Sequence, residues 1–297
     1  MEKPAILHMF TPARNMSPFD VNMAIDAGYQ NVATYGDMSV ADVTALTQDA
    51  IFSRGPKGVA RTGIFIGGRD IDLADDMLRA ARAAMTPPFV VSVFADPSGA
   101  FTTAAAAVAT LERALAAAGG FAGKTFLILG GTGPVGAAAA VLGARLGARV
   151  ELASHASVDR ARHVTDMIAR RYEAAIKPVC ADAAGKAALL ANADVILASA
   201  KAGVQVLSQA ELGGAGKLLA AADLNAVPPA GIEGLDFLGD RKPLASASGR
   251  AVGIGALAVG QVKYQTQRRL FERMLAGQAV TLDFRDAFEM AQAICRE

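Results

Sequence analysis

Short apolar runs alternate with stretches of helical periodicity along the N-terminal third of the chain. Four of these runs predict strands: Pro4–Phe10, Val32–Tyr35, Thr62–Ile66 and Phe89–Phe94. The segments between them carry apolar residues at helical spacing and predict three helices: Pro18–Ala27, Val40–Gln48 and Leu73–Met85. Strands that alternate with helices are typical of βαβ units in a parallel sheet, and right-handed crossovers place the helices on both faces of that sheet.

The following part of the chain repeats this alternation more clearly. Five apolar runs predict strands: Thr125–Leu129, Val150–Ala153, Ile176–Val179, Val195–Ala198 and Leu218–Ala221. Three segments between them predict helices: Pro134–Leu146, Val158–Arg171 and Ala184–Leu190. The pattern predicts a doubly wound, Rossmann-type parallel sheet that begins near residue 124, so the fold class is α/β.

The late start of the Rossmann pattern indicates that a second α/β domain precedes it. Two further helical segments, Gly255–Leu275 and Phe284–Ile294, follow the last Rossmann strand and are expected to pack back onto that first domain. We therefore predict a discontinuous substrate domain of residues 1–103 and 263–297, and a dinucleotide-binding domain of residues 104–262. The 297 residues suit two domains of about 150 residues each.

The charge balance excludes some classes of partner. The chain has 29 Lys and Arg against 28 Asp and Glu, whereas a dedicated nucleic-acid binder needs a basic stripe that neutralises phosphates. Hydrophobic residues make up 53% of the chain, which is enough for a large core and argues against disorder. The alanine-rich stretch from Thr103 to Gly120 carries Glu112 and Arg113, so we interpret it as a buried helix rather than a membrane span.

Cysteine and histidine spacing gives no sign of a metal site or a disulfide framework. The two cysteines, Cys180 and Cys295, do not cluster with His8, His155 or His163. The N-terminus lacks the charged and apolar regions of a signal peptide. We expect a cytoplasmic protein without a metal, nucleic acid or membrane partner. We also expect a homo-oligomer, with a trimer as one candidate state.

The clearest chemical signal is a glycine-rich turn between a predicted strand and an alanine-rich helix. Gly131, Gly133 and Gly136 form GxGxxG, in which the glycines permit a tight turn, close approach of a diphosphate and close helix–strand packing. The helix N-terminus then offers unpaired N–H groups to the phosphates, and Pro134 suits its first turn. A plain connecting turn is the alternative, but the strand–turn–helix context favours dinucleotide binding. The predicted cofactor contacts here are Gly131, Thr132, Gly133, Pro134, Val135 and Gly136.

The end of the second Rossmann strand bears on the choice between NAD and NADP. An acidic residue there would bind the ribose hydroxyls and repel a 2′-phosphate. Glu151 has the nominal spacing but lies inside the predicted strand, whose end falls at Ser154 and His155. Arg160 and Arg162 lie further along the chain. We therefore predict use of both NAD and NADP, with Ser154 and His155 as cofactor contacts, although a solvated loop histidine is an equal alternative for His155.

Several short blocks, in this order and spacing, are similar to one known family. They are Ser17-Pro18-Phe19-Asp20, Thr34-Tyr35-Gly36, Ile64-Phe65-Ile66-Gly67-Gly68, Thr102-Thr103-Ala104-Ala105-Ala106, the glycine turn, Ala222–Pro229 and Gly255-Ala256-Leu257. Over almost its whole length the chain resembles the bacterial NAD(P)-dependent methylene-tetrahydromethanopterin dehydrogenases of methylotrophs. Each block alone is unspecific.

The resemblance implies oxidation of methylene-tetrahydromethanopterin to the methenyl form in formaldehyde oxidation, a part of one-carbon metabolism. It also implies a fold like the methylene-tetrahydrofolate dehydrogenases, with the active site in an interdomain cleft. NADP-restricted relatives carry an arginine just after the second Rossmann strand, where this chain has Ser154-His155-Ala156, and this supports dual use. Loss of hydride leaves a cation shared by two pterin nitrogens, so the enzyme has mainly to position the donor carbon and exclude water.

The resemblance assigns the candidate catalytic lysine to Lys263. It would orient the pterin; either burial lowers its pKa beside the developing cation, or it contacts the pterin carbonyl away from the reacting carbon. A solvated helix lysine is the alternative. Asp20 either accepts hydrogen bonds from pterin N–H groups or stabilises a helix start. Thr102 and Thr103 open the long connecting helix and either cap it or contact the substrate.

Residues after two other strand ends complete the predicted site. Ligands of open α/β sheets bind at the carboxyl ends of strands. We therefore expect Asn225 and Pro228 to contact the nicotinamide side of the cofactor. We also expect Ala200 and Lys201 to contact the cofactor.

Three alternative functions stay open to different degrees. A methylene-tetrahydrofolate dehydrogenase has the same fold, but Lys3 and Lys57 are the only lysines among residues 1–103, so we predict no cyclohydrolase activity. A non-catalytic, dinucleotide-binding regulatory protein would hold NADP without reducing it. A shikimate- or quinate-type dehydrogenase needs a lysine–aspartate pair, and the sequence shows no convincing one.

Overall fold

The computed structural model describes residues 3–183 and 185–297, which fall into two compact units. The first unit comprises residues 1–102 and 264–290, and the second comprises residues 103–263 and 291–297. Three helices contain residues of both units: α5 (Ala100–Ala114), α10 (Ala256–Met274) and α11 (Phe284–Arg296). Residues 291–297, which the sequence analysis placed with the substrate domain, belong to the second unit.

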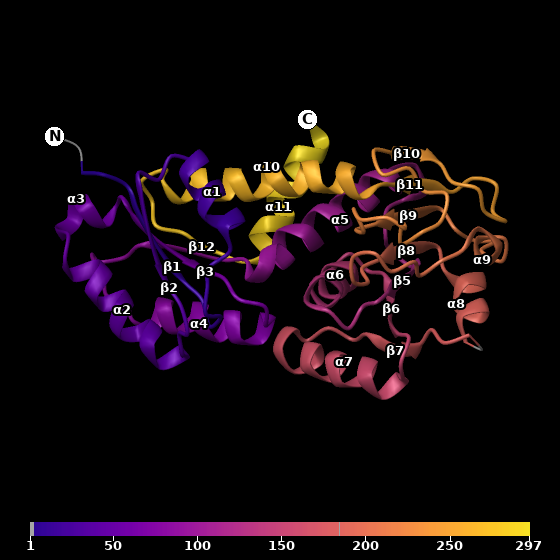
Figure 1. The fold of residues 1–297 in the computed structure, drawn as a ribbon, viewed down its shortest axis with the longest axis horizontal. Coiled ribbons are helices and arrows are strands. Elements are labelled where there is room, and N and C mark those ends of the chain that lie inside the picture. The colour runs from indigo at the N-terminus through magenta and orange to yellow at the C-terminus, as the bar shows by residue number, and fades with distance from the viewer. Residues whose placement is uncertain (1–2, 184) are drawn as a thin grey trace. The chain divides into compact units, whose positions relative to one another are not determined.

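A five-stranded parallel sheet forms the centre of the first unit (Figure 1). In spatial order its strands are β12 (Thr281–Leu282), β4 (Ser92–Ala95), β3 (Thr62–Ile66), β1 (Ile6–Phe10) and β2 (Asn31–Tyr35). The connecting helices are α1 (Pro18–Asp26), α2 (Val40–Phe52), α3 (Gly55–Val59) and α4 (Ile71–Ala83). The middle strand β3 is buried at every residue, as a strand of a parallel sheet covered on both faces should be.

Aromatic packing holds the later part of helix α10 in the first unit. The ring of Phe271 lies 5.4 Å from the rings of both Phe65 and Phe94, centroid to centroid. All three side chains are fully buried. The hydroxyl of Ser92 also donates a hydrogen bond to the carbonyl of Met274 at 3.0 Å. These contacts explain why a segment so late in the sequence belongs to the N-terminal unit.

A seven-stranded sheet forms the centre of the second unit. Its spatial order is β10 (Asp240–Pro243), β11 (Val252–Ile254), β9 (Ala220–Asp223), β8 (Val195–Ala198), β5 (Thr125–Leu129), β6 (Arg149–Ser154) and β7 (Lys177–Cys180). Its helices include α6 (Pro134–Arg145), α7 (Val158–Tyr172), α8 (Lys186–Asn192) and α9 (Gln209–Leu212). All strand pairs are parallel except β10 with β11, and the sheet is doubly wound, as predicted.

Most predicted strands agree with the structure within a few residues, but some elements differ. The strand predicted at Phe89–Phe94 begins only at Ser92, because the amide of Phe89 donates to the carbonyl of Thr86 in a turn. Strand β10 was not predicted, because its four residues are all exposed and give no apolar pattern. Strand β12, which has two residues, was not predicted either. Ala184, the first residue of one predicted helix, lies outside the described residues.

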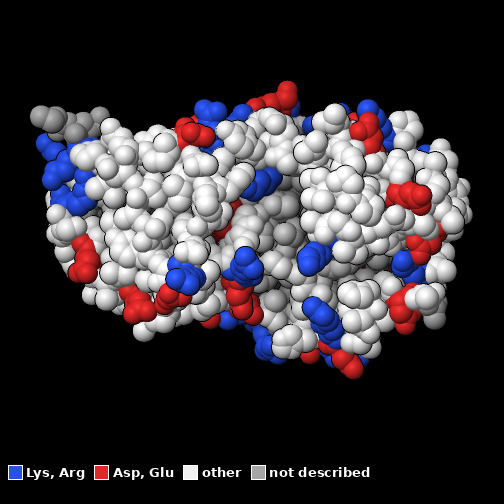
Figure 2. Space-filling view, in the orientation of Figure 1, with Lys and Arg blue, Asp and Glu red and all other residues white. Residues whose placement is uncertain are grey.

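The surface carries mixed charge. On the face shown in Figure 2, basic and acidic side chains are interspersed, without a broad area of either sign. Within the described ranges, no helix is both long enough and apolar enough to cross a membrane. Among the same residues, no three side chains of the metal-ligating types form a group.

Candidate functional site

A cavity of about 710 Å³ opens at the carboxyl ends of strands β5 to β8. Ligands of open α/β sheets bind at this edge, where the strand order reverses. Its lining comes from the loops after β5, β6, β7 and β8, and includes Gly130, Thr132, Gly133 and Pro134 of the glycine turn. A larger cavity, about 930 Å³, lies at the amino ends of the strands. Of these two cavities, the first contains the glycine turn, where the sequence predicts a dinucleotide, and we name it the nucleotide cavity.

Two of the three motif glycines are required by close packing. A Cβ atom at Gly136 would lie 2.5 Å from the Cα atom of Gly131, so helix α6 could not approach the turn so closely. A Cβ atom at Gly131 would lie 2.9 Å from Leu152 Cγ, against strand β6. Gly130, which the sequence analysis did not include, has a φ of +69° and packs against the backbone of Ala200. These glycines fix the turn between β5 and α6.

Gly133 is different, because a Cβ atom there would meet nothing within 4 Å. It is the N-cap residue of α6, lines the cavity and offers no side chain to the first turn of that helix. Pro134 follows at the first helical position. The N–H groups of that turn are therefore open to a ligand, and the missing side chain leaves the space that a diphosphate needs. The turn fits a dinucleotide.

Of the two cofactor contacts predicted after strand β6, one lines the cavity and the other stabilises the loop beside it. His155 lines the cavity. Ser154 does not: it is buried, and its hydroxyl accepts hydrogen bonds from the amides of Ala156 and Ser157 at 3.2 and 3.4 Å. Ser154 thus shapes the loop that presents His155.

Glu151 does not reach the cavity at the glycine turn. Its carboxylate forms an ion pair with Lys177 at 2.7 Å, across the register between β6 and β7, and it lines the cavity at the amino ends. Among the described residues that line the nucleotide cavity, none is acidic. Glu151, the carboxylate at the nominal spacing for repelling a 2′-phosphate, therefore lies outside the cavity of the glycine turn.

The structure brings two basic side chains to the cavity that were not among the predicted cofactor contacts. Arg160 lies in the first turn of α7, Lys186 is the first residue of α8, and both line the cavity with the predicted Lys201. Arg160 lies six residues beyond the end of strand β6 and was therefore not predicted to contact the cofactor. The loop between β6 and α7 is short, however, so the first turn of α7 lies at the carboxyl end of the sheet. Ala200, also predicted, lines the same cavity.

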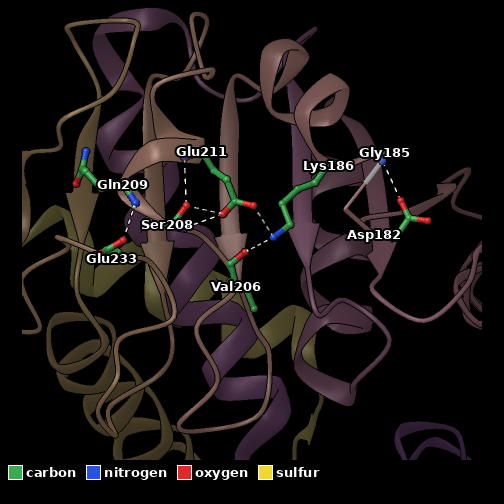
Figure 3. A network of polar contacts seen from close by, with 8 residues as sticks. All are labelled: Asp182, Gly185, Lys186, Val206, Ser208, Gln209, Glu211 and Glu233. Carbon is green, nitrogen blue, oxygen red and sulfur yellow. Dashed lines mark hydrogen bonds and ion pairs between the residues drawn. The ribbon is translucent and has the colours of Figure 1, made fainter.

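A polar network ties Lys186 into the wall of the cavity (Figure 3). Its ammonium group contacts a carboxylate oxygen of Glu211 at 2.8 Å and donates to the carbonyl of Val206 at 2.9 Å. The other carboxylate oxygen of Glu211 accepts from the amide and hydroxyl of Ser208, a capping box at the start of α9. Burial alone would raise the pKa of Glu211, but the hydrogen bonds from Lys186 and Ser208 and the charge of Lys186 together hold it below its usual value.

Asn225 and Pro228, predicted on the nicotinamide side, do not line this cavity. The side chain of Asn225 is buried; its oxygen accepts from the amides of Gly203 and Val227, each at 3.0 Å, and its nitrogen donates to the carbonyl of Pro229. Asn225 therefore joins the loop after β8 to the loop after β9. Pro228 is exposed on the second of these loops.

Asp20 is buried in the first unit at the start of helix α1. Its Oδ1 atom accepts a hydrogen bond of 2.7 Å from the side-chain amide of Gln267, which is fully buried on α10. No local pattern points to Gln267, because only packing brings residues 20 and 267 together. Lys263 lies half-buried on α10, four residues before Gln267.

Thr102 lies inside helix α5, which begins at Ala100, two residues earlier than predicted. Asp96, four residues before this helix, supplies acceptors for its first turn: its Oδ1 atom accepts from the amides of Phe101 and Thr102, and its Oδ2 atom accepts from the Thr102 hydroxyl at 2.6 Å. Asp96 and Thr102 are fully buried. Thr103, in contrast, is partly exposed.

Comparison with known proteins decides the family. The family model described as "Methylene-tetrahydromethanopterin dehydrogenase, N-terminal" matches residues 18–98. The NAD(P)-dependent methylenetetrahydromethanopterin dehydrogenase of Methylorubrum extorquens is 49% identical over 294 residues, which cover 98% of each chain. The chain belongs to the methylene-tetrahydromethanopterin dehydrogenase family. A further relative, the Bifunctional protein MdtA of the same organism, is 30% identical and covers 97% of this chain and 98% of its own length.

Solved structures agree on the fold of this methylene-tetrahydromethanopterin dehydrogenase family member. The ligand-free form of a 5-ketofructose reductase from Gluconobacter matches with a TM-score of 0.52 over 98% of this chain and 99% of that chain. The sequence identity is 15%, so this similarity concerns the Rossmann-like fold alone.

Proposed function

We propose that this protein oxidises methylene-tetrahydromethanopterin to methenyl-tetrahydromethanopterin, with NAD or NADP as the hydride acceptor. The observation that carries the proposal is the 49% identity, over 98% of both chains, to an enzyme named for this reaction. The methylene carbon loses one hydride to the nicotinamide ring, and the products are the methenyl cation and NADH or NADPH. No proton has to be removed in this step.

The second unit supports the proposal because its residues suit a dinucleotide. The N-terminus of α6 and the side-chain-free position of Gly133 would receive the diphosphate. Ala200 and Lys201, on the loop after β8, would contact the cofactor further along the cavity. Asn225 would act indirectly, because its hydrogen bond to the Gly203 amide holds that loop in place. The absence of acidic side chains from the described lining supports use of both cofactors.

In the first unit, we assign Asp20 to the pterin. A carboxylate accepts hydrogen bonds from the amino and ring N–H groups of a pterin, and Gln267 orients this carboxylate through the 2.7 Å bond. A buried charge is tolerated only where hydrogen bonds compensate it, and this contact supplies one. Thr103, partly exposed, remains a proposed substrate contact, whereas Thr102 holds the start of α5 through Asp96.

Lys263 is the proposed catalytic residue. A half-buried lysine can donate hydrogen bonds that fix the pterin in the orientation from which hydride leaves. This role needs a donor, and it does not require a change in the protonation state of the lysine during hydride transfer.

Steady-state kinetics test the proposed function. The purified protein is given NAD or NADP with methylene-tetrahydromethanopterin or methylene-tetrahydrofolate, and both methenyl product and reduced cofactor are measured. We expect turnover with the methanopterin carrier and both cofactors. Binding of cofactor without reduction would support the regulatory protein, and a preference for the folate carrier would support the folate dehydrogenase. We also propose a cytoplasmic homo-oligomer, which fractionation and light scattering test.

A further inference from the structure

The part of the nucleotide cavity after strand β6 is basic. In Rossmann folds the end of this strand lies beside the 2′ position of the adenosine ribose, where an acidic residue selects NAD and an arginine accommodates the 2′-phosphate of NADP. His155 and Arg160 line the cavity here, Lys186 lines it after β7, and no carboxylate does so among the described residues. A phosphate group would therefore meet positive charge on this side of the cavity.

Arg160 occupies a position that local structure does not favour. It is the third residue of α7, whose N-cap Ser157 accepts a hydrogen bond from the Arg160 amide at 3.3 Å. A cation near a helix N-terminus faces the positive end of the helix dipole, whereas an anion bound there is stabilised. The structure also gives the Arg160 guanidinium no hydrogen bond or ion pair to any described residue. An anion bound between this guanidinium and the helix start would offset the unfavourable interaction with the helix dipole. It would also give the guanidinium a hydrogen-bonding partner.

Lys186 is placed in the same cavity, but its charge is already neutralised. Glu211 forms an ion pair with it at 2.8 Å, and the Lys186 and Glu211 side chains are 23% and 37% exposed. The capping box with Ser208 holds Glu211 at this distance. The two cations thus differ: Arg160 is available to a ligand, whereas Lys186 is held by a carboxylate.

We propose that Arg160 binds the 2′-phosphate of NADP, and that Glu211 limits the preference for NADP by neutralising Lys186. This inference rests on one part of the proposed function, namely that a dinucleotide binds at the glycine turn. It explains how the chain would accept NADP without an arginine directly after β6, and NAD without an acidic residue there.

The first test removes the Arg160 charge and measures binding alone. The ligands are 2′,5′-ADP and 5′-AMP, which differ by the 2′-phosphate, and the affinities come from titration calorimetry. Loss of a charge-assisted contact in Arg160→Gln should weaken 2′,5′-ADP binding by about 10-fold or more. The affinity for 5′-AMP should change far less. Glutamine is compatible with the third position of a capped helix, so α7 should form normally.

Arg162→Gln is the matched control. Arg162 lies on the same helix, is 55% exposed and pairs with Asp159 at 2.8 Å, so this variant removes the same net charge outside the cavity. It should leave the 2′,5′-ADP affinity near that of the unchanged protein. Equal losses in the two variants, or none in Arg160→Gln, would overturn the assignment of Arg160.

The second test releases Lys186. Glu211→Gln keeps an acceptor for Ser208 and removes the negative charge, so Lys186 can turn toward a phosphate in the cavity. We expect 2′,5′-ADP to bind about threefold more tightly or better at low salt. The gain should disappear in the double variant Lys186→Met/Glu211→Gln. Unchanged affinity in Glu211→Gln, or a gain that persists in the double variant, would refute the role of Glu211.

These measurements are independent of the hydride-transfer reaction. A protein that binds 2′,5′-ADP through Arg160 but forms no methenyl pterin would contradict the proposed function and support this inference. If the protein forms methenyl pterin with NADP, but Arg160→Gln binds 2′,5′-ADP as tightly as the unchanged protein, the proposed function is supported and this inference is contradicted.

Discussion

The same substitution at two glycines of one turn should separate folding from cofactor binding. Gly136 and Gly133 are three residues apart, yet a Cβ atom meets backbone at 2.5 Å at the first and open space at the second. Gly136→Ala therefore forces α6 away from the turn, whereas Gly133→Ala places a methyl group where the diphosphate would lie. The first change should destabilise the protein, and the second should weaken dinucleotide binding.

The expected magnitudes follow from these contacts. Overpacking against backbone costs about 1–3 kcal/mol, so Gly136→Ala should lower the Tm of the second unit, which has the size of a single domain, by roughly 2–12 °C. At Gly133, φ is −84° and ψ is 170°, which alanine adopts without strain. There the loss of unfolded-state entropy favours alanine by about 0.4–1 kcal/mol, and the poorer N-cap offsets about as much. The free energy of unfolding should change by less than about 0.5 kcal/mol.

Urea unfolding and cofactor titration together form the assay. Gly133→Ala should unfold like the unchanged protein and bind NAD and NADP at least about 10-fold more weakly, which is about 1.4 kcal/mol. Because the methyl group faces the diphosphate, both cofactors should be affected equally. Normal binding by Gly133→Ala would show that the diphosphate does not lie at this turn. Equal destabilisation of the two variants would contradict the packing difference between Gly133 and Gly136.

Three further outcomes are expected. Lys263→Ala should lower turnover far more than cofactor affinity, and unchanged turnover would remove this lysine from the catalytic site. Asp96→Ala should lower the unfolding free energy by about 2 kcal/mol or more in urea titrations, because Thr102 and two amides lose their acceptor; a change below about 0.5 kcal/mol would contradict this. Burial and the charge of Arg54 lower the pKa of His8, which contacts the Tyr35 hydroxyl at 3.0 Å. As the pH falls, the unfolded chain therefore takes up the His8 proton before the folded protein does. The free energy of unfolding that His8 contributes above pH 6.5 should be lost as the pH falls through the folded-state pKa. In His8→Asn, the free energy of unfolding should depend less on pH in this range.

Local patterns of neighbouring residues were enough to predict part of this fold. Strands β3 and β5 are buried at every residue, so each forms a continuous apolar run with bounds that the pattern predicts. The glycine turn was found for the same reason: its geometry depends on the residues between Gly131 and Gly136, which are adjacent in the chain. Edge strand β10 was missed because exposed residues carry no hydrophobic pattern.

Which polar groups meet depends on how distant elements pack, and no local pattern predicts it. Asp20 and Gln267 are far apart in sequence, Lys186 and Glu211 come from different helices, and Arg160 reaches the cavity because of the direction in which α7 starts. Sequence spacing also could not show that Glu151 pairs with Lys177 at the opposite end of the sheet. A side chain's partner depends on packing between elements, whereas the elements themselves follow from the periodicity of neighbouring residues.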